Sequence, residues 1–255
     1  MAEVATQYEE IPEPDISHLV TEDDEPVDNL YSERQQALLA DALNVSWNPD
    51  REFLTMVNVG LFYSLQSPPY VPDFLLSMDV KAPPDVWEKK HRSYFIWQYG
   101  KRPDLVVEVV SNIDRHEERK IEGYAQIGIP YYVIHDPEHR LSERTLRAFE
   151  LHGSRYVELV KPWFVDLEIG LALWKGEYRG IEESWLRWCD RQGTPLLTGA
   201  ERADQESERA DQERERADQE RERADQERER ADQERERAAL LEAKLRELGI
   251  DPESV

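Results

Sequence analysis

Two acidic residues in the middle of the chain have the setting that metal-assisted phosphate chemistry requires. Glu108 interrupts the apolar run 105–110, and burying a carboxylate is costly unless it is paired or bound to a cation. Asp73 follows Pro72 at the start of another apolar segment. Carboxylates on neighbouring strands can meet on one face, where Mg²⁺ or Mn²⁺ binds them, polarises a phosphate and lowers the pKa of a bound water. We therefore predict that Asp73 and Glu108 are metal-binding catalytic residues.

Lys120 is the predicted cationic partner of these acids. It belongs to segment 113–128, which has the features of a helix that Gly128 ends and Pro130 follows. A lysine beside the stripe that packs on a sheet can reach over the strand ends. There its ammonium group orients water or neutralises charge that builds on the phosphorus. The same helical face carries Glu117, Ile121 and Tyr124.

The segments around Glu108 predict a strand, a helix and a second strand. Residues 105–110 have the β-branched apolar pattern of a strand buried on both faces. After helix 113–128, residues 131–135 form another short apolar run. Three such elements in about 30 residues make a βαβ unit with parallel strands.

Three further elements are expected before and four after the βαβ unit. Ser32 and Gln35 fit a capping box that opens a helix through about Asn44. Apolar alternation predicts a strand over 57–65, and a second strand follows over 70–80. Downstream, a hairpin is predicted from strands at 145–151 and 155–160. Two short tryptophan-bearing segments, in a sheet or at its rim, are predicted at 171–174 and 185–188.

The two ends of the chain differ from its middle. Residues 1–30 hold ten acidic and no basic residues, which predicts a disordered acidic arm before a domain over 31–195. Residues 196–255 read as a linker and a charged helix with a seven-residue repeat. Alanine fills only one of the two apolar positions of a coiled coil, so a solvated single helix is favoured over a weak coiled coil.

Charge and composition restrict the function. The net charge is −23, and residues 31–200 carry 25 acidic against 20 basic side chains, which argues against a generic basic nucleic-acid binder. An enzyme that grips phosphates with a local patch and metal ions is still allowed. Lys89, Lys90 and Arg92, followed by several aromatic residues, are the candidate DNA contacts. The alternative for these aromatic residues is ordinary packing at the rim of the sheet.

A cytoplasmic location is expected. Cys189 is the single cysteine, which rules out an internal disulfide framework. No apolar run has the length of a membrane span, and the acidic start lacks the basic region of a signal peptide.

The chain resembles the Uma-two restriction endonuclease family of the PD-(D/E)XK nuclease superfamily. The matching text is Tyr70-Val-Pro-Asp73, then Pro103-Asp104-Leu-Val-Val-Glu108-Val-Val-Ser111, then the run from Lys120 to Pro137. The resemblance covers about residues 32–195. It implies an α/β fold with an αβββαβ core and a mixed sheet, and cleavage of DNA by a divalent metal. By position, Asp73 is the motif aspartate and Glu108 the motif acid.

The chain departs from the family pattern at two places. Val110 stands where the superfamily signature has lysine, and Lys120 of the next helix takes that role. The usual segment before the first helix is missing, so Glu33 is the candidate for a first-helix acid. Two alternatives follow: a catalytically inactive nuclease fold that only binds nucleic acid, or a module that interacts through its long helix. The resemblance also allows a homodimer.

Overall fold

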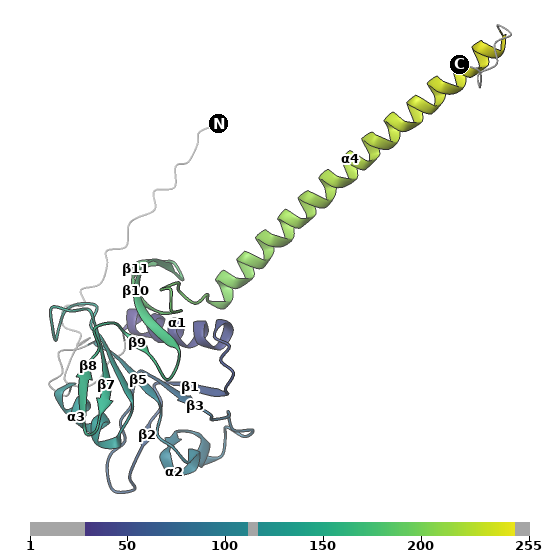
Figure 1. Cartoon of the computed structure of the whole chain (residues 1–255). Coiled ribbons are helices and arrows are strands. Elements are labelled where there is room, and N and C mark those ends of the chain that lie inside the picture. The colour runs from purple at the N-terminus through teal and green to yellow at the C-terminus, as the bar shows by residue number, and fades with distance from the viewer. Residues whose placement is uncertain (1–28, 112–116, 248–255) are drawn as a thin grey trace, which may run out of the picture. The chain divides into compact units, whose positions relative to one another are not determined.

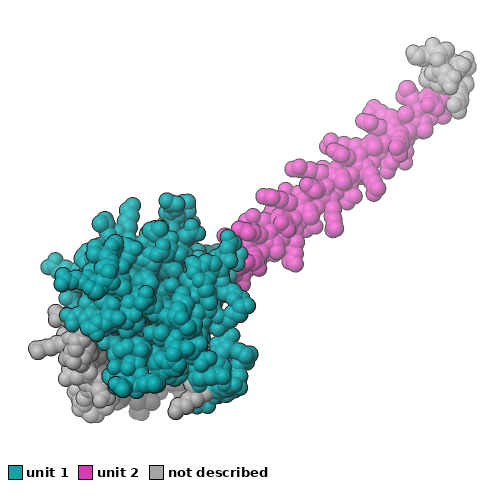
Figure 2. All heavy atoms as spheres, turned by 60° about the horizontal axis from the view of Figure 1, so that its bottom comes forward, with its two compact units in different colours: residues 1–198 teal, residues 199–255 magenta. Residues whose placement is uncertain are grey.

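A computed structural model describes residues 29–111 and 117–247, without the side chains of Lys89 and of residues 117–119 and 245–247. The predicted acidic arm therefore lies outside the described residues, apart from Asn29 and Leu30. The chain divides into two compact units, residues 1–198 and 199–255, coloured teal and magenta in Figure 2. Among the described residues, no helix combines the length and the apolar character needed to cross a membrane.

Unit 1 is built around a mixed six-stranded sheet with the order β1-β3-β5-β6-β7-β8 (Figure 1). The parallel pair is β5 with β6, and the other neighbours are antiparallel. This confirms the α/β class and the mixed sheet predicted from the sequence. The strands are β1 Phe53–Val57, β3 Phe74–Met78, β5 Leu105–Val109, β6 Tyr131–His135, β7 Leu146–His152 and β8 Arg155–Glu158.

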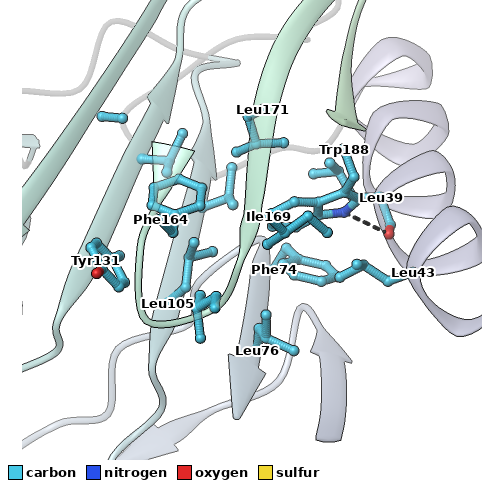
Figure 3. Packing of buried hydrophobic residues seen from close by; sticks show 14 of the residues in the cluster. Leu39, Leu43, Phe74, Leu76, Leu105, Tyr131, Phe164, Ile169, Leu171 and Trp188 are labelled. Carbon is cyan, nitrogen blue, oxygen red and sulfur yellow. Dashed lines mark hydrogen bonds between the residues drawn. The ribbon is translucent and has the colours of Figure 1, made fainter. Parts of the chain in front are cut away.

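Both faces of the sheet are covered, which explains the unbroken apolar character of β5. Helix α1 (Leu30–Ser46) packs on one face, where Leu39 joins Leu105 and Trp188 in a buried cluster (Figure 3). The indole Nε1–H of Trp188 donates to the carbonyl oxygen of Leu39 at 3.0 Å. Helix α3 (Glu117–Ile127) packs on the other face, where Tyr124 joins a second buried cluster.

The predicted βαβ unit is confirmed. Strands β5 and β6 are parallel, with Leu105 opposite Tyr131, and α3 connects them. The predicted helix began at residue 113, and residues 112–116 lie outside the described part of the chain. Gly128 has φ +83°, and its N–H and that of Ile129 both donate to the carbonyl oxygen of Tyr124. Glycine adopts this left-handed conformation easily, so α3 ends where the sequence predicts.

The first helix begins earlier than predicted. Asn29, not Ser32, is the N-cap, and its side chain accepts from the N–H of Ser32 at 2.9 Å. Asparagine is among the strongest N-cap residues, and it moves the helix start to Leu30. Ser32 lies inside the helix and is buried.

The single strand predicted over 57–65 is wrong. Strand β1 ends at Val57 because Asn58 adopts φ 50°, which turns the chain out of the extended conformation. The chain resumes as the two-residue β2 (Leu61–Phe62), parallel to β4 (Tyr94–Phe95). The segment around β4 also contains the short helices η1 (Lys89–His91) and α2 (Ile96–Tyr99).

The tryptophan-bearing segments are longer than predicted. They belong to the hairpin of β10 (Ile169–Tyr178) and β11 (Ile181–Cys189), which forms a separate sheet with β9 (Trp163–Phe164). Trp185 and Trp188 are fully buried, so they are core and not rim residues. The earlier hairpin, β7 with β8, is confirmed, and Gly153 at its turn has φ +66°.

Unit 2 contains the predicted charged helix, α4 (Gly199–Glu247). Every residue from Arg202 to Lys244 is exposed. Ion pairs one turn apart join Arg202 to Glu206, Arg214 to Asp211 and Arg235 to Asp232. Each such pair stabilises a helix by only about 0.2–0.5 kcal/mol, but the repeat supplies many acid–base neighbours.

Candidate active site

The pairing of β3 with β5 brings the two predicted acids to one end of the sheet. Leu75 lies opposite Val106, and both belong to the cluster under α3. Side chains alternate along a strand, so Glu108, two residues after Val106, is expected on the α3 side as well. Asp73 lies at the bend just before β3. The Val109 N–H donates to Asp73 Oδ2 at 2.6 Å, so the Asp73 carboxylate lies beside the end of the strand that carries Glu108.

Glu108 is a buried carboxylate with two strong donors. Its side chain is only 3% exposed. Lys120 Nζ donates to Oε2 at 2.8 Å, and the Tyr124 hydroxyl donates to Oε1 at 2.6 Å. Pairing with an ammonium group and a hydroxyl offsets the desolvation of the carboxylate. This is how the chain accommodates an acid inside an apolar strand.

Lys120 lies in α3, and its side chain is 26% exposed, so it reaches the buried acid from a partly open position. Val110 occupies the position where the superfamily signature has lysine, and it is buried in the apolar cluster under α3. The geometry thus brings Lys120 to the motif acid from the helix, as the sequence predicts.

Asp73 is held by α1 as well as by β5. The amide Nε2 of Gln36 donates to Asp73 Oδ1 at 2.8 Å, and Asn58 Nδ2 donates to Gln36 Oε1 at 2.9 Å. Gln36 is 3% exposed. It lies three residues before Leu39 and seven before Leu43, so it is a polar residue in the apolar stripe of α1.

Sequence reasoning missed Gln36 and did not assign a role to Tyr124. The interruption of an apolar stripe was the available signal for Gln36. For Tyr124 it was the spacing of four from Lys120 on one helical face. Glu33, the candidate first-helix acid, has an exposed side chain that pairs with Arg34 at 3.3 Å, so Gln36 is the α1 residue that reaches Asp73.

The candidate DNA contacts lie in and beside η1. Lys90 Nζ pairs with Glu88 at 2.6 Å, and Arg92 Nε donates to the carbonyl oxygen of Trp87 at 2.9 Å. The side chain of Lys89 lies outside the described residues. Of the aromatic residues that follow them, Tyr94 is fully buried in the cluster under α3 and Tyr99 packs against that cluster, whereas Trp97 is 50% exposed.

A buried histidine connects α1 to the strand beside β5. His135 lies opposite Val109 in the register, and its Nε2 is 2.8 Å from the Tyr31 hydroxyl. That hydroxyl donates to the carbonyl oxygen of Ser184 in β11 at 2.7 Å. Burial lowers the pKa of His135 to about 4, so the imidazole is neutral at pH 7.

The donor set suits a hard divalent cation that keeps open coordination positions. Asp73 and Glu108 offer carboxylate oxygens, the type of ligand that hard divalent cations bind. Within residues 29–111 and 117–247, no cluster of three or more His, Cys, Asp or Glu side chains is found that could hold a metal. Mg²⁺ binds in proteins through one or two carboxylates and completes its shell with waters and substrate phosphate. Two acids therefore fit Mg²⁺ or Mn²⁺ but not a closed structural metal site.

Two comparisons with known proteins find a match. The family model Uma2, described as "Putative restriction endonuclease", matches residues 6–174. A solved structure described as "a putative nuclease belonging to DUF820" from Anabaena variabilis is 14% identical, with a TM-score of 0.38. That match covers 55% of this chain and 72% of the other. No curated protein matches the chain.

Proposed function

Because the chain belongs to the Uma2 restriction endonuclease family, we propose that it hydrolyses DNA phosphodiester bonds as a divalent-metal-dependent endonuclease. One observation carries the proposal. The buried Glu108 carboxylate is bound by Lys120, and the backbone N–H of the next residue, Val109, binds Asp73. A purely structural ion pair explains Glu108 alone. It does not explain a second acid fixed at the same strand end.

In the proposed mechanism Asp73 and Glu108 hold Mg²⁺ or Mn²⁺. The bound ion would polarise the scissile phosphate and lower the pKa of an attacking water. Val109 and Gln36 fix the orientation of the Asp73 carboxylate through its two oxygens. Preorganised ligands of this kind need no rearrangement during the reaction.

Lys120 supplies the positive charge that the strand lacks. Its ammonium group contacts Glu108, and its partial exposure gives it access to a phosphate at the surface. In this role it positions water or neutralises the negative charge that grows on the phosphorus in the transition state. Lys89, Lys90 and Arg92 are the proposed contacts to the DNA backbone.

The first prediction is that Mg²⁺ or Mn²⁺ supports nicking of a supercoiled plasmid by the wild-type chain. Asp73→Ala and Glu108→Gln remove a metal ligand each, and we expect a loss of about 100-fold or more in nicking rate for either. Glu108→Gln keeps the shape of the side chain, so folding is checked by circular dichroism at the same temperature.

Glu122→Gln is the matched control for Glu108→Gln, because Glu122 is an exposed acid of α3. We expect it to nick at the wild-type rate. Full activity of Glu108→Gln in both metals would remove Glu108 from the mechanism.

A second candidate function is nucleic-acid binding without cleavage. Two observations favour it. Val110 occupies the position of the signature lysine, and the α1 residue that contacts Asp73 is a glutamine, Gln36. DNA affinity that persists in EDTA, together with no nicking in Mg²⁺ or Mn²⁺, would support binding alone. The third interpretation, a module that interacts through α4, predicts that DNA affinity is absent and that deletion of residues 199–255 removes an interaction.

A further inference from the structure

Glu108 receives two donors of different charge, one on each oxygen. Lys120 carries a full positive charge, whereas the Tyr124 hydroxyl is neutral. Each donor stabilises the ionised carboxylate. A second ammonium group would also repel a divalent cation, whereas a hydroxyl stabilises the carboxylate without adding positive charge.

The Tyr124 ring is held from two sides. Its centroid lies 5.0 Å from that of Tyr70 and 5.2 Å from that of Tyr132, and both pairs are tilted. Tyr124 is fully buried. Packing from two sides restricts the orientation of the ring, so its hydroxyl is held against Glu108.

Gly123 makes the contact between Tyr70 and Tyr124 possible. A Cβ at position 123 would lie 2.0 Å from the Tyr70 hydroxyl oxygen and 2.4 Å from its Cζ. Glycine inside a helix costs about 1 kcal/mol relative to alanine. The close approach of Tyr70 to the backbone of α3 is a physical reason for glycine at this position.

We propose that Tyr124 is a positioning residue for the metal site: its hydroxyl orients the Glu108 carboxylate, and the approach of Tyr70 over Gly123 fixes Tyr124. This inference rests on the proposed function, because it requires Glu108 to bind a divalent cation. Tyr124 acts through Glu108 and need not touch the substrate.

The test measures Mn²⁺ binding to the full chain in the absence of DNA. Electron paramagnetic resonance detects the free ion, and its signal falls as Mn²⁺ binds. Tyr124→Phe removes the hydroxyl and keeps the ring. We expect the Mn²⁺ dissociation constant to rise by about 10-fold or more, as for other groups that orient a ligand.

Tyr156→Phe is the matched control. Tyr156 packs on Tyr132 in the same cluster, and its hydroxyl donates to the carbonyl oxygen of Ile129 at 2.8 Å. It therefore loses a comparable buried hydrogen bond, but not one to Glu108. We expect wild-type Mn²⁺ affinity. Gly123→Ala is a second variant, and the displacement of Tyr70 should weaken Mn²⁺ binding in it as well.

The outcomes separate the two hypotheses. Wild-type affinity in Tyr124→Phe would overturn the positioning role while Mn²⁺ binding itself stands. An equal loss in Tyr156→Phe would also overturn it, because the effect would then be general loosening of the cluster. If the wild-type chain binds no Mn²⁺, or Glu108→Gln binds it equally well, the metal-dependent function fails and the inference fails with it.

Discussion

At the scale of single residues, the two acids of the candidate site differ in how they are stabilised. Glu108 has a cationic partner, Lys120, and Asp73 has neutral donors, Gln36 and the Val109 N–H. The two carboxylates are thus held by different elements: Glu108 by the side chain of Lys120 in α3, and Asp73 by a side chain of α1 and a backbone N–H of β5.

Gln36 is the residue at which a substitution is expected to strengthen metal binding. Gln36→Glu removes the donor to Asp73 Oδ1 and places a like charge beside it. In EDTA we expect this variant to be less stable than wild type by about 1–3 kcal/mol. In Mn²⁺ a third carboxylate group favours binding of the ion, so the metal should raise the melting temperature of the variant more than that of wild type. Thermal unfolding with EDTA or Mn²⁺ measures both effects.

Gln35→Glu is the control for this prediction. Gln35 is the neighbouring buried amide of α1, but it bonds to the backbone of Leu186 in β11. Its substitution should destabilise the chain without any added response to Mn²⁺. Equal responses of Gln36→Glu and wild type to Mn²⁺ would argue against a metal ion close to Asp73.

At the scale of elements, α1 is the common support of the site and of the second sheet. Gln36 faces Asp73, whereas Gln35 and Tyr31 bond to Leu186 and Ser184 of β11. The N-terminal part of one helix thus fixes both the strand end that carries Asp73 and the hairpin that covers the core. Loosening this part of α1 should affect stability and the site together.

His135 makes that junction sensitive to acid. The pKa of about 4 in the folded chain lies below the usual value of 6.5, so the unfolded chain binds more protons between these values. Stability should therefore be highest above pH 6.5 and fall progressively as the pH drops to about 4. The full difference corresponds to roughly 3 kcal/mol. Urea unfolding of wild type and His135→Gln at pH 7.5 and pH 5 measures it, and the variant should lose less stability on acidification.

His152→Gln is the control for the pH experiment, since His152 is exposed on β7 and pairs only at the surface with Glu150. It should follow the wild-type pH dependence. An identical slope in His135→Gln would mean that His135 does not account for the acid sensitivity.

At the scale of the whole molecule, the two units have opposite physical character. Unit 1 contains the buried clusters, whereas α4 exposes all its side chains from Arg202 to Lys244. Helices of this composition gain their stability from propensity and repeated ion pairs instead of a core. We propose that residues 31–195 form the nuclease domain and that the helix serves as a spacer.

Deletion of residues 199–255 is expected to leave unit 1 folded and active. Its buried clusters contain no residue of α4, so the melting temperature of chain 1–198 should stay within about 2 °C of the full chain. If α4 is a solvated single helix, light scattering should show the same oligomeric state before and after deletion. A lower oligomeric state in the shortened chain would establish α4 as a coiled coil that joins copies.

Local signals account for what the sequence by itself determined. The βαβ unit was predicted from the apolar runs 105–110 and 131–135 and from the glycine after α3. These signals are local, because hydrophobic periodicity and helix ends depend on neighbouring residues. An acid among valines singled out Glu108, and the seven-residue repeat predicted α4. The proximity of Asp73, Glu108 and Lys120 followed from this order of elements, and their catalytic roles stay predictions.

Tertiary structure alone decided the partners of these residues. Gln36 reaches Asp73 across 37 positions and Tyr124 reaches Glu108 across 16, and neither contact has a local pattern. Asn58 adopts a left-handed conformation and ends β1, although the alternation of apolar residues continues beyond it. The outer half of the β10–β11 hairpin is partly exposed and polar, so its strands extend beyond the apolar segments seen in the sequence. Hydrogen bonds and packing between distant segments depend on how the whole chain folds, so no short window of the sequence contains them.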